Sequence, residues 1–260
     1  ARHQQSIKGL VMIFSIVTIF PSLIESCLQS GVVARARKEG KVEIEAVDLR
    51  SFTRDRHRTT DDRPFGGGEG MVMTPEPLSL AICHSVREQL RDRRVILLSP
   101  QGRRFCQETA AELSRQQQLI LVCGRYEGVD ERFRAKYVDE EVSLGDFILS
   151  GGELPALMVV DAVTRLLPGV LGCADSAVRD TFSRHLLKHP QYTRPRIFEE
   201  MEVPEVLFSG DHNRIKEFRF VESVKRTIER RPDLLKKAVV TFSDREKRLL
   251  KNYGVNLEAD

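Results

Sequence analysis

The chain has 260 residues, of which 41% are hydrophobic and 30% charged, so it can fold as one large domain or two modest ones. Its 41 Lys and Arg residues against 38 Asp and Glu leave a net charge of only +3, which excludes recognition of a partner by overall charge alone. The five cysteines form no CxxC pair, which argues against a disulfide framework or a zinc site and favours a reducing, cytoplasmic location.

The first half of the chain alternates between strand-like and helical patterns. Apolar strand-like runs cover residues 10–20, 42–48, 94–99 and 118–123, and helical patterns fill 22–38, 77–91 and 103–116. This alternation predicts an α/β domain with a mostly parallel sheet. The first run also resembles the apolar part of a signal segment, but it is too short to span a bilayer and Pro21 ends it as a strand-to-helix loop would. We therefore expect a buried strand and no membrane partner.

The second half is predicted to be helical. An amphipathic helix is expected over 154–167, followed by small and polar residues at 172–183 that predict a flexible interdomain linker. Further helices are expected at 213–231, 232–239 and 243–252, with Asp211 as the N-cap of the first. We thus expect an α/β domain over residues 12–171 and a small all-helical domain over 184–260, which carries the whole excess of basic charge.

Three glycine-punctuated turns follow apolar runs in the α/β part. They are LSPQG at 98–102, CGRYEG at 123–128 and SLGDFILSGGE at 143–153. Glycine lets the main chain approach a ligand closely, so such turns can offer backbone hydrogen-bonding groups to a planar ligand, which points to a nucleoside-type cofactor. Each turn alone could also be a tight strand-to-helix connection. The chain has no GxxxxGK[ST], GxGxxG or GxSxG motif, which disfavours phosphoryl transfer, Rossmann-type dinucleotide binding and serine hydrolysis.

Six segments form a longer, ordered set of motifs. They are DRHRTTDDRPFGGGEGMVM (55–73), LSPQGRRF (98–105), LVCGRYEGVDER (121–132), SLGDFILSGGELPAL (143–157), RLLPGVLG (165–172) and HPQYTRP (189–195). Together they resemble the bacterial tRNA (guanine-N1)-methyltransferase family, over residues 12 to about 253. The resemblance implies methyl transfer from S-adenosyl-L-methionine to N1 of the guanosine immediately 3′ of the anticodon in tRNA. It also implies a deep trefoil knot of the SPOUT type and a cytoplasmic homodimer with its active sites at the subunit interface.

The resemblance assigns the cofactor site to the three turns. The residues implied are Leu98, Ser99, Pro100, Gln101 and Gly102 in the first; Gly124, Tyr126, Glu127 and Gly128 in the second; and Ser143, Leu144, Gly145, Asp146, Phe147, Ile148, Leu149, Gly151, Gly152 and Pro155 in and after the third.

Two residues are implied to carry the chemistry. By resemblance, Asp180 is the base that takes the N1 proton, and Arg165 is the cation beside the guanine oxygen. An aspartate with its ordinary pKa of about 3.9 is a weak base, so a closed site would have to raise that pKa. From its position alone, Arg165 could instead interact with the carboxyl end of its helix. Whether a divalent cation is required cannot be inferred from the residues.

RNA contacts are expected in two basic regions. The resemblance implies Glu127, Arg54, Arg56, His57, Arg58 and Gly70 as substrate contacts. Residues 50–63 carry five arginines and residues 214–237 carry nine basic against four acidic side chains, so both can contact phosphates, although either could be a solvated face. Two other functions stay open, a non-catalytic RNA-binding protein and a knotted ribose methyltransferase. The helical C-terminal region and the HPQYTRP segment argue against the second.

Overall fold

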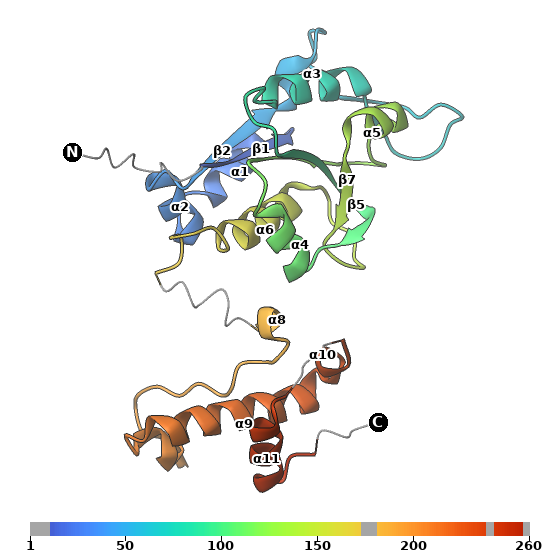
Figure 1. The fold of residues 1–260 in the computed structure, drawn as a ribbon. Helices are drawn as coiled ribbons and strands as arrows, with labels where there is room; N and C mark the ends of the chain where they lie inside the picture. Colours follow the sequence, from blue (N-terminus) through green and yellow to red (C-terminus); the bar gives the residue numbers. More distant parts are fainter. Residues whose placement is uncertain (1–10, 173–180, 238–241, 257–260) are drawn as a thin grey trace, which may run out of the picture. The chain divides into compact units, whose positions relative to one another are not determined.

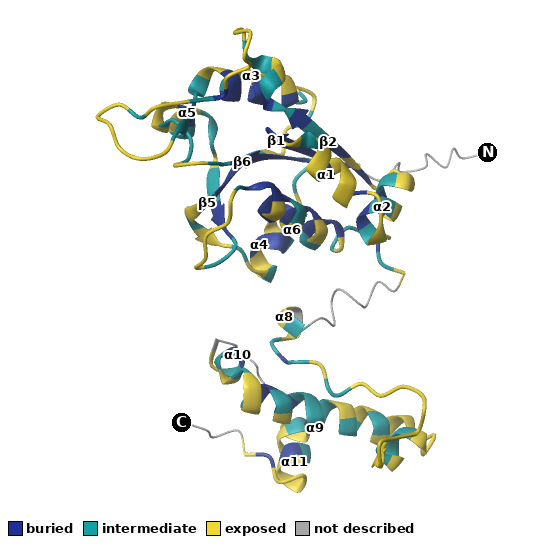
Figure 2. Cartoon of the chain, turned by 180° about the vertical axis from the view of Figure 1, so that it is seen from behind, coloured by how far each residue is buried: buried dark blue, intermediate teal, exposed yellow. Residues whose placement is uncertain are grey.

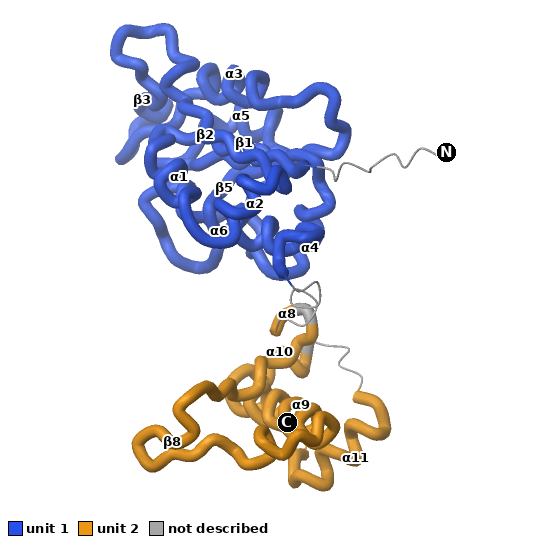
Figure 3. The backbone as a smooth tube through the Cα atoms, turned by 90° about the vertical axis from the view of Figure 1, so that its left-hand side faces the viewer, with its two compact units in different colours: residues 1–174 blue, residues 175–260 orange. Residues whose placement is uncertain are grey.

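The structure of the chain is a computed structural model that describes residues 11–172, 181–237 and 242–256. The chain divides into two compact units, residues 1–174 and 175–260, drawn in different colours in Figure 3. The boundary between the units falls inside the segment that the sequence predicts to be a linker.

Unit 1 is built on a five-stranded sheet (Figure 1). The strands are β1 (Met12–Thr18), β2 (Val42–Asp48), β5 (Arg93–Arg104), β6 (Gln118–Cys123) and β7 (Glu140–Ser143). Their order is β2-β1-β6-β5-β7, and every neighbouring pair is parallel. The predicted parallel sheet is confirmed, and β2 and β6 have the predicted bounds. The apolar run at 10–20 forms the buried strand β1.

Helices cover both faces of the sheet (Figure 1). One face carries α1 (Pro21–Cys27), α2 (Gly31–Lys38), α4 (Gln107–Leu113) and α6 (Glu153–Thr164). The other carries α3 (Pro75–Ser85), α5 (Glu131–Tyr137) and the 3₁₀ helix η1 (Leu49–Phe52). Two short strands, β3 (Asp61–Asp62) and β4 (Val72–Met73), form a separate antiparallel pair.

Three predicted helices differ from the observed ones. The expected single helix at 22–38 is two helices, because the chain turns after α1 and resumes at Gly31 with a φ of +78°. Helix α3 ends at Ser85, six residues before the expected end at 91. Helix α4 is shorter than predicted because β5 continues to Arg104.

The core of unit 1 is split in two by the sheet. Leu119, Leu121 and Cys123 of β6 pack on one face, and Ile120 and Val122 pack on the other, because side chains alternate along a strand. All six residues of β6 are buried, as the dark strands in Figure 2 show. Because both sides are covered, residues 119–123 of this strand are apolar, and the one polar residue, Gln118 at its start, is hydrogen-bonded to Ser15 and Ser85. No helix in the described parts of the chain is long and apolar enough to cross a bilayer.

Unit 2 is organised around one long helix, α9 (His212–Arg230). The predicted N-cap is confirmed, since the carboxylate of Asp211 accepts hydrogen bonds from the backbone N–H groups of Asn213 and Arg214. The apolar stripe of α9 packs against Leu250 of α11. The other helices are α8 (Thr181–Arg184), the 3₁₀ helix η2 (Glu205–Phe208), α10 (Pro232–Lys237) and α11 (Asp244–Asn252).

Unit 2 is not all-helical, so that prediction is wrong. Strands β8 (Ile197–Phe198) and β9 (Met201–Glu202) form an antiparallel hairpin. Its turn residues Glu199 and Glu200 have φ values of +47° and +65°. A hairpin of two-residue strands leaves no alternating apolar pattern to detect, and glutamate is an unusual residue in the left-handed region.

Strand β5 is interrupted where it carries the first glycine turn. Its register with β7 shifts between Leu98 and Arg103, so the residues between them bulge out of the ladder. A Cβ at Gly102 would lie 2.3 Å from the main-chain carbon of Glu141 and from the nitrogen of Val142. No side chain fits there without moving one of the two strands.

Replacing Gly102 by alanine is therefore expected to lower the free energy of unfolding by about 1–3 kcal/mol, the usual cost of forcing extra atoms into a packed site. Urea denaturation followed by circular dichroism measures this change. The matched control is Gly172→Ala, because a Cβ at Gly172 has no described atom within 4 Å. Equal stability of the two variants would contradict the close approach of β5 and β7.

Candidate active site

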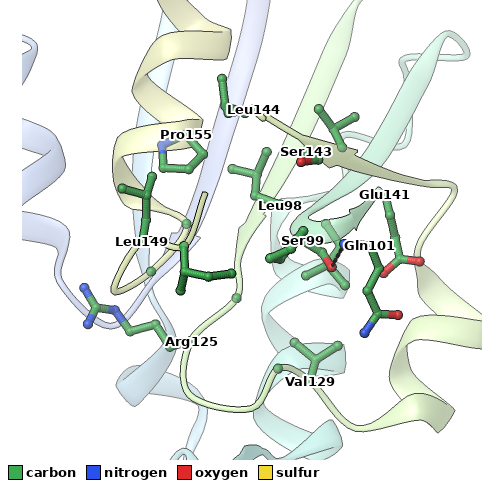
Figure 4. A pocket seen from close by; sticks show the side chains of 18 of the residues that line it. Leu98, Ser99, Gln101, Arg125, Val129, Glu141, Ser143, Leu144, Leu149 and Pro155 are labelled. Atoms are coloured by element: carbon green, nitrogen blue, oxygen red, sulfur yellow. Dashed lines mark hydrogen bonds between the residues drawn. The ribbon is translucent and has the colours of Figure 1, made fainter. Parts of the chain in front are cut away.

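The three glycine turns meet at a pocket of about 440 Å³ beside the carboxyl ends of β5, β6 and β7 (Figure 4). The lining includes residues 98–101 of the first turn, 124–128 of the second, 143–145 and 147–152 of the third, and Pro155 of α6. Neighbouring parallel strands end at the same edge of a sheet, which is where α/β proteins usually bind ligands.

The second and third turns pack directly on each other. The backbone N–H of Gly152 donates to the carbonyl oxygen of Gly124 at 2.9 Å. A Cβ at Gly152 would lie 2.6 Å from the Cα of Cys123, so this contact requires glycine. The chain leaving β7 is thereby fixed against the end of β6.

The pocket has an apolar side and a polar side. In Figure 4, Leu98, Leu149 and Pro155 gather on one side, and Gln101 and Glu141 lie on the other. Apolar walls favour a planar ring, and the glycine backbone between them can supply donors and acceptors to the edge of the ring. This arrangement suits a nucleoside.

Charged residues that the sequence did not single out also line the pocket. Arg134 of α5 contacts Glu131 with 2.5 Å between Nη2 and Oε1, and its Nη1 lies 3.8 Å from a carboxylate oxygen of Glu141. The hydrogen bond from Arg134 lowers the pKa of Glu131. Glu131 lies within the motif at 121–132, whereas Arg134 and Glu141 lie outside the six motifs, because neither α5 nor β7 was predicted.

The second turn holds a strained residue. Tyr126 has a φ of +56°, a conformation that a bulky side chain rarely adopts, and the N–H of Gly128 closes the turn on the carbonyl of Arg125 at 3.0 Å. Such outliers cluster at functional sites because surrounding contacts must enforce them. The half-exposed ring of Tyr126 lines the pocket.

A buried ion pair joins the turns behind the pocket. The carboxylate of Glu153, only 1% exposed, accepts a hydrogen bond from Thr18 Oγ1 at 2.8 Å and from Arg125 Nη2 at 3.0 Å. The guanidinium of Arg125 lies over the ring of Phe20, 4.3 Å from its centre. Glu153 is the first residue of α6, so its negative charge also interacts favourably with the helix N-terminus. One carboxylate thus connects β1, the second turn and α6.

Neighbouring residues are adapted to this ion pair. A Cβ at Gly151 would lie 2.5 Å from Glu153 Oε2 and 2.6 Å from Arg125 Nε, so glycine leaves the space that the pair occupies. Burial, with the negative charge of Glu153, raises the pKa of the Cys123 thiol well above its usual value. Cys123 is therefore a neutral packing residue. Arg125 lies in the motif at 121–132 and Glu153 in the motif at 143–157, but no sequence pattern indicates that the two side chains pair.

The structure also brings together two residues expected to contact the substrate. A Cβ at Gly70 would lie 2.6 Å from Cγ of Glu127, so the glycine-rich loop packs on the second turn. Backbone hydrogen bonds fix this contact, from Glu127 N–H to the carbonyl of Met71 at 2.9 Å and from Met73 N–H to that of Gly128 at 2.9 Å. Residues 70–73 thus adjoin the second turn of the pocket.

The basic loop between η1 and β3 is exposed and lies outside the pocket lining. Asp55 holds the loop, accepting hydrogen bonds from the N–H groups of His57 and Thr59 and from the Thr59 hydroxyl. The hydroxyl bond is the main reason that the pKa of Asp55 is lowered. Four side chains of the loop, Arg54, Arg56, His57 and Arg58, are exposed. Their contact with RNA stays a prediction.

Three other predicted residues do not line the pocket, and a fourth falls outside the part of the chain that the structure describes. Gly102 is a packing residue between β5 and β7, and the exposed Asp146 forms an ion pair with Arg104 at 2.6 Å. Arg165 is the exposed C-cap of α6. Asp180 lies outside the described residues. Within the described ranges, no group of three or more His, Cys, Asp or Glu side chains is placed to hold a metal ion.

Comparison with known proteins identifies the family. Residues 12–237 match the sequence model described as tRNA (Guanine-1)-methyltransferase TrmD. The chain belongs to this family. It is 50% identical over 243 residues to the tRNA (guanine-N(1)-)-methyltransferase of Desulfatibacillum aliphaticivorans, covering 94% of this chain and 92% of the relative. The protein of the same name from Neisseria meningitidis serogroup C is 51% identical over 239 residues, covering 92% and 95%. The family match includes all three turns and α6.

Replacing Glu153 by glutamine tests the ion pair. Loss of the charge should lower the free energy of unfolding by about 1.5–3 kcal/mol, the usual value of a hydrogen bond to a charged group. It should also loosen two walls of the pocket and weaken the binding of S-adenosyl-L-methionine on the order of 10-fold, measured by calorimetry.

Gln118→Leu is the matched control for this variant. Gln118 is fully buried at the opposite end of β6 and bonds Ser15 and Ser85. Its loss should lower stability without changing the affinity for the cofactor. The same affinity loss in both variants would show that Glu153 contributes only general stability.

Proposed function

We propose that this chain transfers a methyl group from S-adenosyl-L-methionine to N1 of the guanosine immediately 3′ of the anticodon in tRNA. The observation that carries the proposal is the convergence of three separate turns, all within the family match, on one pocket. Relatives that are about half identical over more than nine-tenths of their length bear the name of this activity.

The residues that line the pocket fit the cofactor. Its volume of about 440 Å³ is in the range of small-molecule sites, and its apolar side can cover an adenine ring while turn backbone contacts the edge of the ring. We assign this role to Leu98, Leu144, Leu149 and Pro155, with the backbone of residues 143–149. When bound, the cofactor supplies a methyl group already activated by a sulfonium. The protein then has mainly to position the guanine and to remove the proton from its N1 atom.

Two residues are assigned to the chemistry, one to accept the N1 proton and one to stabilise the negative charge that develops on the guanine. As the N1–CH₃ bond forms and the methyl–sulfur bond breaks, the N1 proton passes to the carboxylate of Asp180. Negative charge that develops on the guanine carbonyl oxygen is stabilised by the guanidinium of Arg165, which is charged at any working pH. Both assignments rest on the family resemblance.

The position of Arg165 supports a site shared between two copies of the chain. Helix α6 begins at the pocket and ends before Arg165, so its 12 residues separate the two by about 18 Å. Arg165 therefore cannot serve the pocket of its own chain without a large rearrangement. A second copy can bring its own Arg165 to this pocket.

The exposed face of α6 supports the same arrangement. Leu154, Met158, Asp161 and Arg165 are exposed at spacings of four, three and four residues, which places them on one stripe. Two large apolar residues on that stripe are typical of an interface that another subunit covers. We propose a homodimer in which this stripe crosses the subunit boundary.

Two further expectations belong to this proposal. We infer a trefoil knot, because the chain leaves the edge strand β7 and returns to pack on the turn after the central strand β6, beside the bulge of β5. We also propose that the protein acts in the cytoplasm, where its tRNA substrate is found. The basic loop at 54–58 and the basic residues of α9 are the proposed phosphate contacts.

Incubation with labelled S-adenosyl-L-methionine and tRNA transcripts tests the proposed specificity. Methyl transfer is expected to transcripts with guanosine 3′ of the anticodon and to fall to background when that base is adenosine, because adenine has no N1 proton to remove and no carbonyl oxygen for Arg165. Equal transfer to both transcripts would refute the proposed target.

The role of Asp180 is tested by Asp180→Asn. Loss of a general base should reduce turnover about 100-fold or more while leaving the affinity for the cofactor unchanged. Asp175→Asn is the matched control, because it removes a nearby carboxylate that no family motif contains. If both variants keep wild-type turnover, the base is another group.

A further inference from the structure

Unit 2 contains a second cavity, which none of the arguments above has used. It has a volume of about 460 Å³ and is lined by the HPQYTRP segment, by η2 with the residues before it, and by α9. All of these elements belong to unit 2, so the cavity does not depend on how the two units are arranged.

The charged groups of this cavity are all positive. Arg194, Arg196 and Arg219 line it, and the described residues that line it include no carboxylate. Arg196 is held in place, because its Nη2 lies 2.7 Å from Glu202 Oε1 and its guanidinium stacks on the ring of Phe208, 4.7 Å from the centre. Arg194 and Arg219 are exposed. Exposed guanidinium groups around a hollow suit the oxygens of a phosphate.

The cavity also has aromatic walls. Tyr192 and Phe208 line it and are 46% and 52% exposed. Large rings left this open to water are favourable docking surfaces for a flat partner. The half-buried side chain of Leu207 adds an apolar contact. A planar ring next to a phosphate is the chemistry of a nucleotide.

The cavity also contains an amide and an imidazole. Gln191 lines the cavity, and its Nε2 lies 3.1 Å from Nδ1 of His189. An amide and an imidazole can donate to and accept from the edge of a base. Proteins bind single-stranded RNA in this way, with unstacked bases on aromatic rings or arginine planes and basic side chains on the backbone.

We propose that this cavity binds one unpaired nucleotide of the RNA substrate, other than the methylated guanosine. The base stacks on Tyr192 and on the Phe208–Arg196 pair, and a neighbouring phosphate lies between Arg194 and Arg219. The inference rests on the proposed function, which supplies RNA as the ligand. It adds a requirement to that function, because a substrate must present an unstacked nucleotide to unit 2 as well as the target guanosine to unit 1.

Binding and turnover of the full-length protein with a tRNA transcript test the base contact. Tyr192→Ala and Phe208→Ala are expected to weaken tRNA binding on the order of 10-fold each, because stacking on one aromatic ring contributes this much or more. The KM for tRNA should rise by a similar factor, while kcat and the affinity for S-adenosyl-L-methionine stay unchanged. Tyr253→Ala is the control, since Tyr253 is 47% exposed in unit 2 and does not line the cavity.

Salt dependence tests the phosphate contact. Arg219→Gln should reduce the slope of log K against log salt concentration by about 0.7, the value for one phosphate of a single strand. Arg245→Gln is the control on α11, because Arg245 is exposed and does not line the cavity. A transcript carrying 4-thiouridine in its loops should form a photo-crosslink to the peptide that contains Tyr192.

Two outcomes would overturn the proposal. Wild-type affinity of both aromatic variants, with weakening only in Arg219→Gln, would mean that the cavity holds a phosphate without a base. An equal loss of affinity in Tyr253→Ala would mean that the effect is general to unit 2. The proposed function fails separately, if the wild-type protein transfers no methyl group. Binding of the transcript would still test the cavity in that case.

Discussion

The buried contact of Glu153 with Arg125 and Thr18 is the interaction on which the pocket depends. A carboxylate that is 1% exposed is stable only if it is paired and hydrogen-bonded, so the fold must bring three segments to it at once. Those segments are the end of β1, the turn after β6 and the start of α6. Satisfying one charge therefore sets the relative positions of the central strands and of the helix that starts at the pocket.

The second constraint on the pocket is the close approach of its segments at glycine residues. At Gly70, Gly102, Gly151 and Gly152, a single added carbon would lie within 2.6 Å of a neighbouring atom. At Gly102 and Gly152 that neighbour is main chain, which cannot rotate away as the end of a side chain can. The turns therefore pack on one another through main-chain atoms, and Gly151 and Gly152 also line the pocket. Sequence motifs rich in glycine here reflect contacts between segments as much as contact with a ligand.

The sequence predicted the strands with an apolar or alternating pattern better than the shortest strands. Strand β6 was predicted with its observed bounds because a strand buried on both faces is almost continuously apolar, and Asp211 was found because an N-cap is a local signal. Strand β7 has only four residues and begins with two glutamates, and the hairpin at 197–202 has strands of two, so neither shows a periodic pattern. The three turns of the site could be predicted because each is a recognisable glycine-rich motif. The ion pair between Arg125 and Glu153 could not be predicted, because it depends on tertiary contacts.

The bulge in β5 affects how a ligand can enter. The strand pairs with β7 before the bulge and again after it, through Arg103 and Arg104, so this wall of the pocket is attached to the sheet at both ends. Swinging it outward would break ladder hydrogen bonds on either side. The wall is therefore preorganised, and little conformational entropy is lost there on binding. Entry and release of a ligand therefore do not depend on outward movement of this wall.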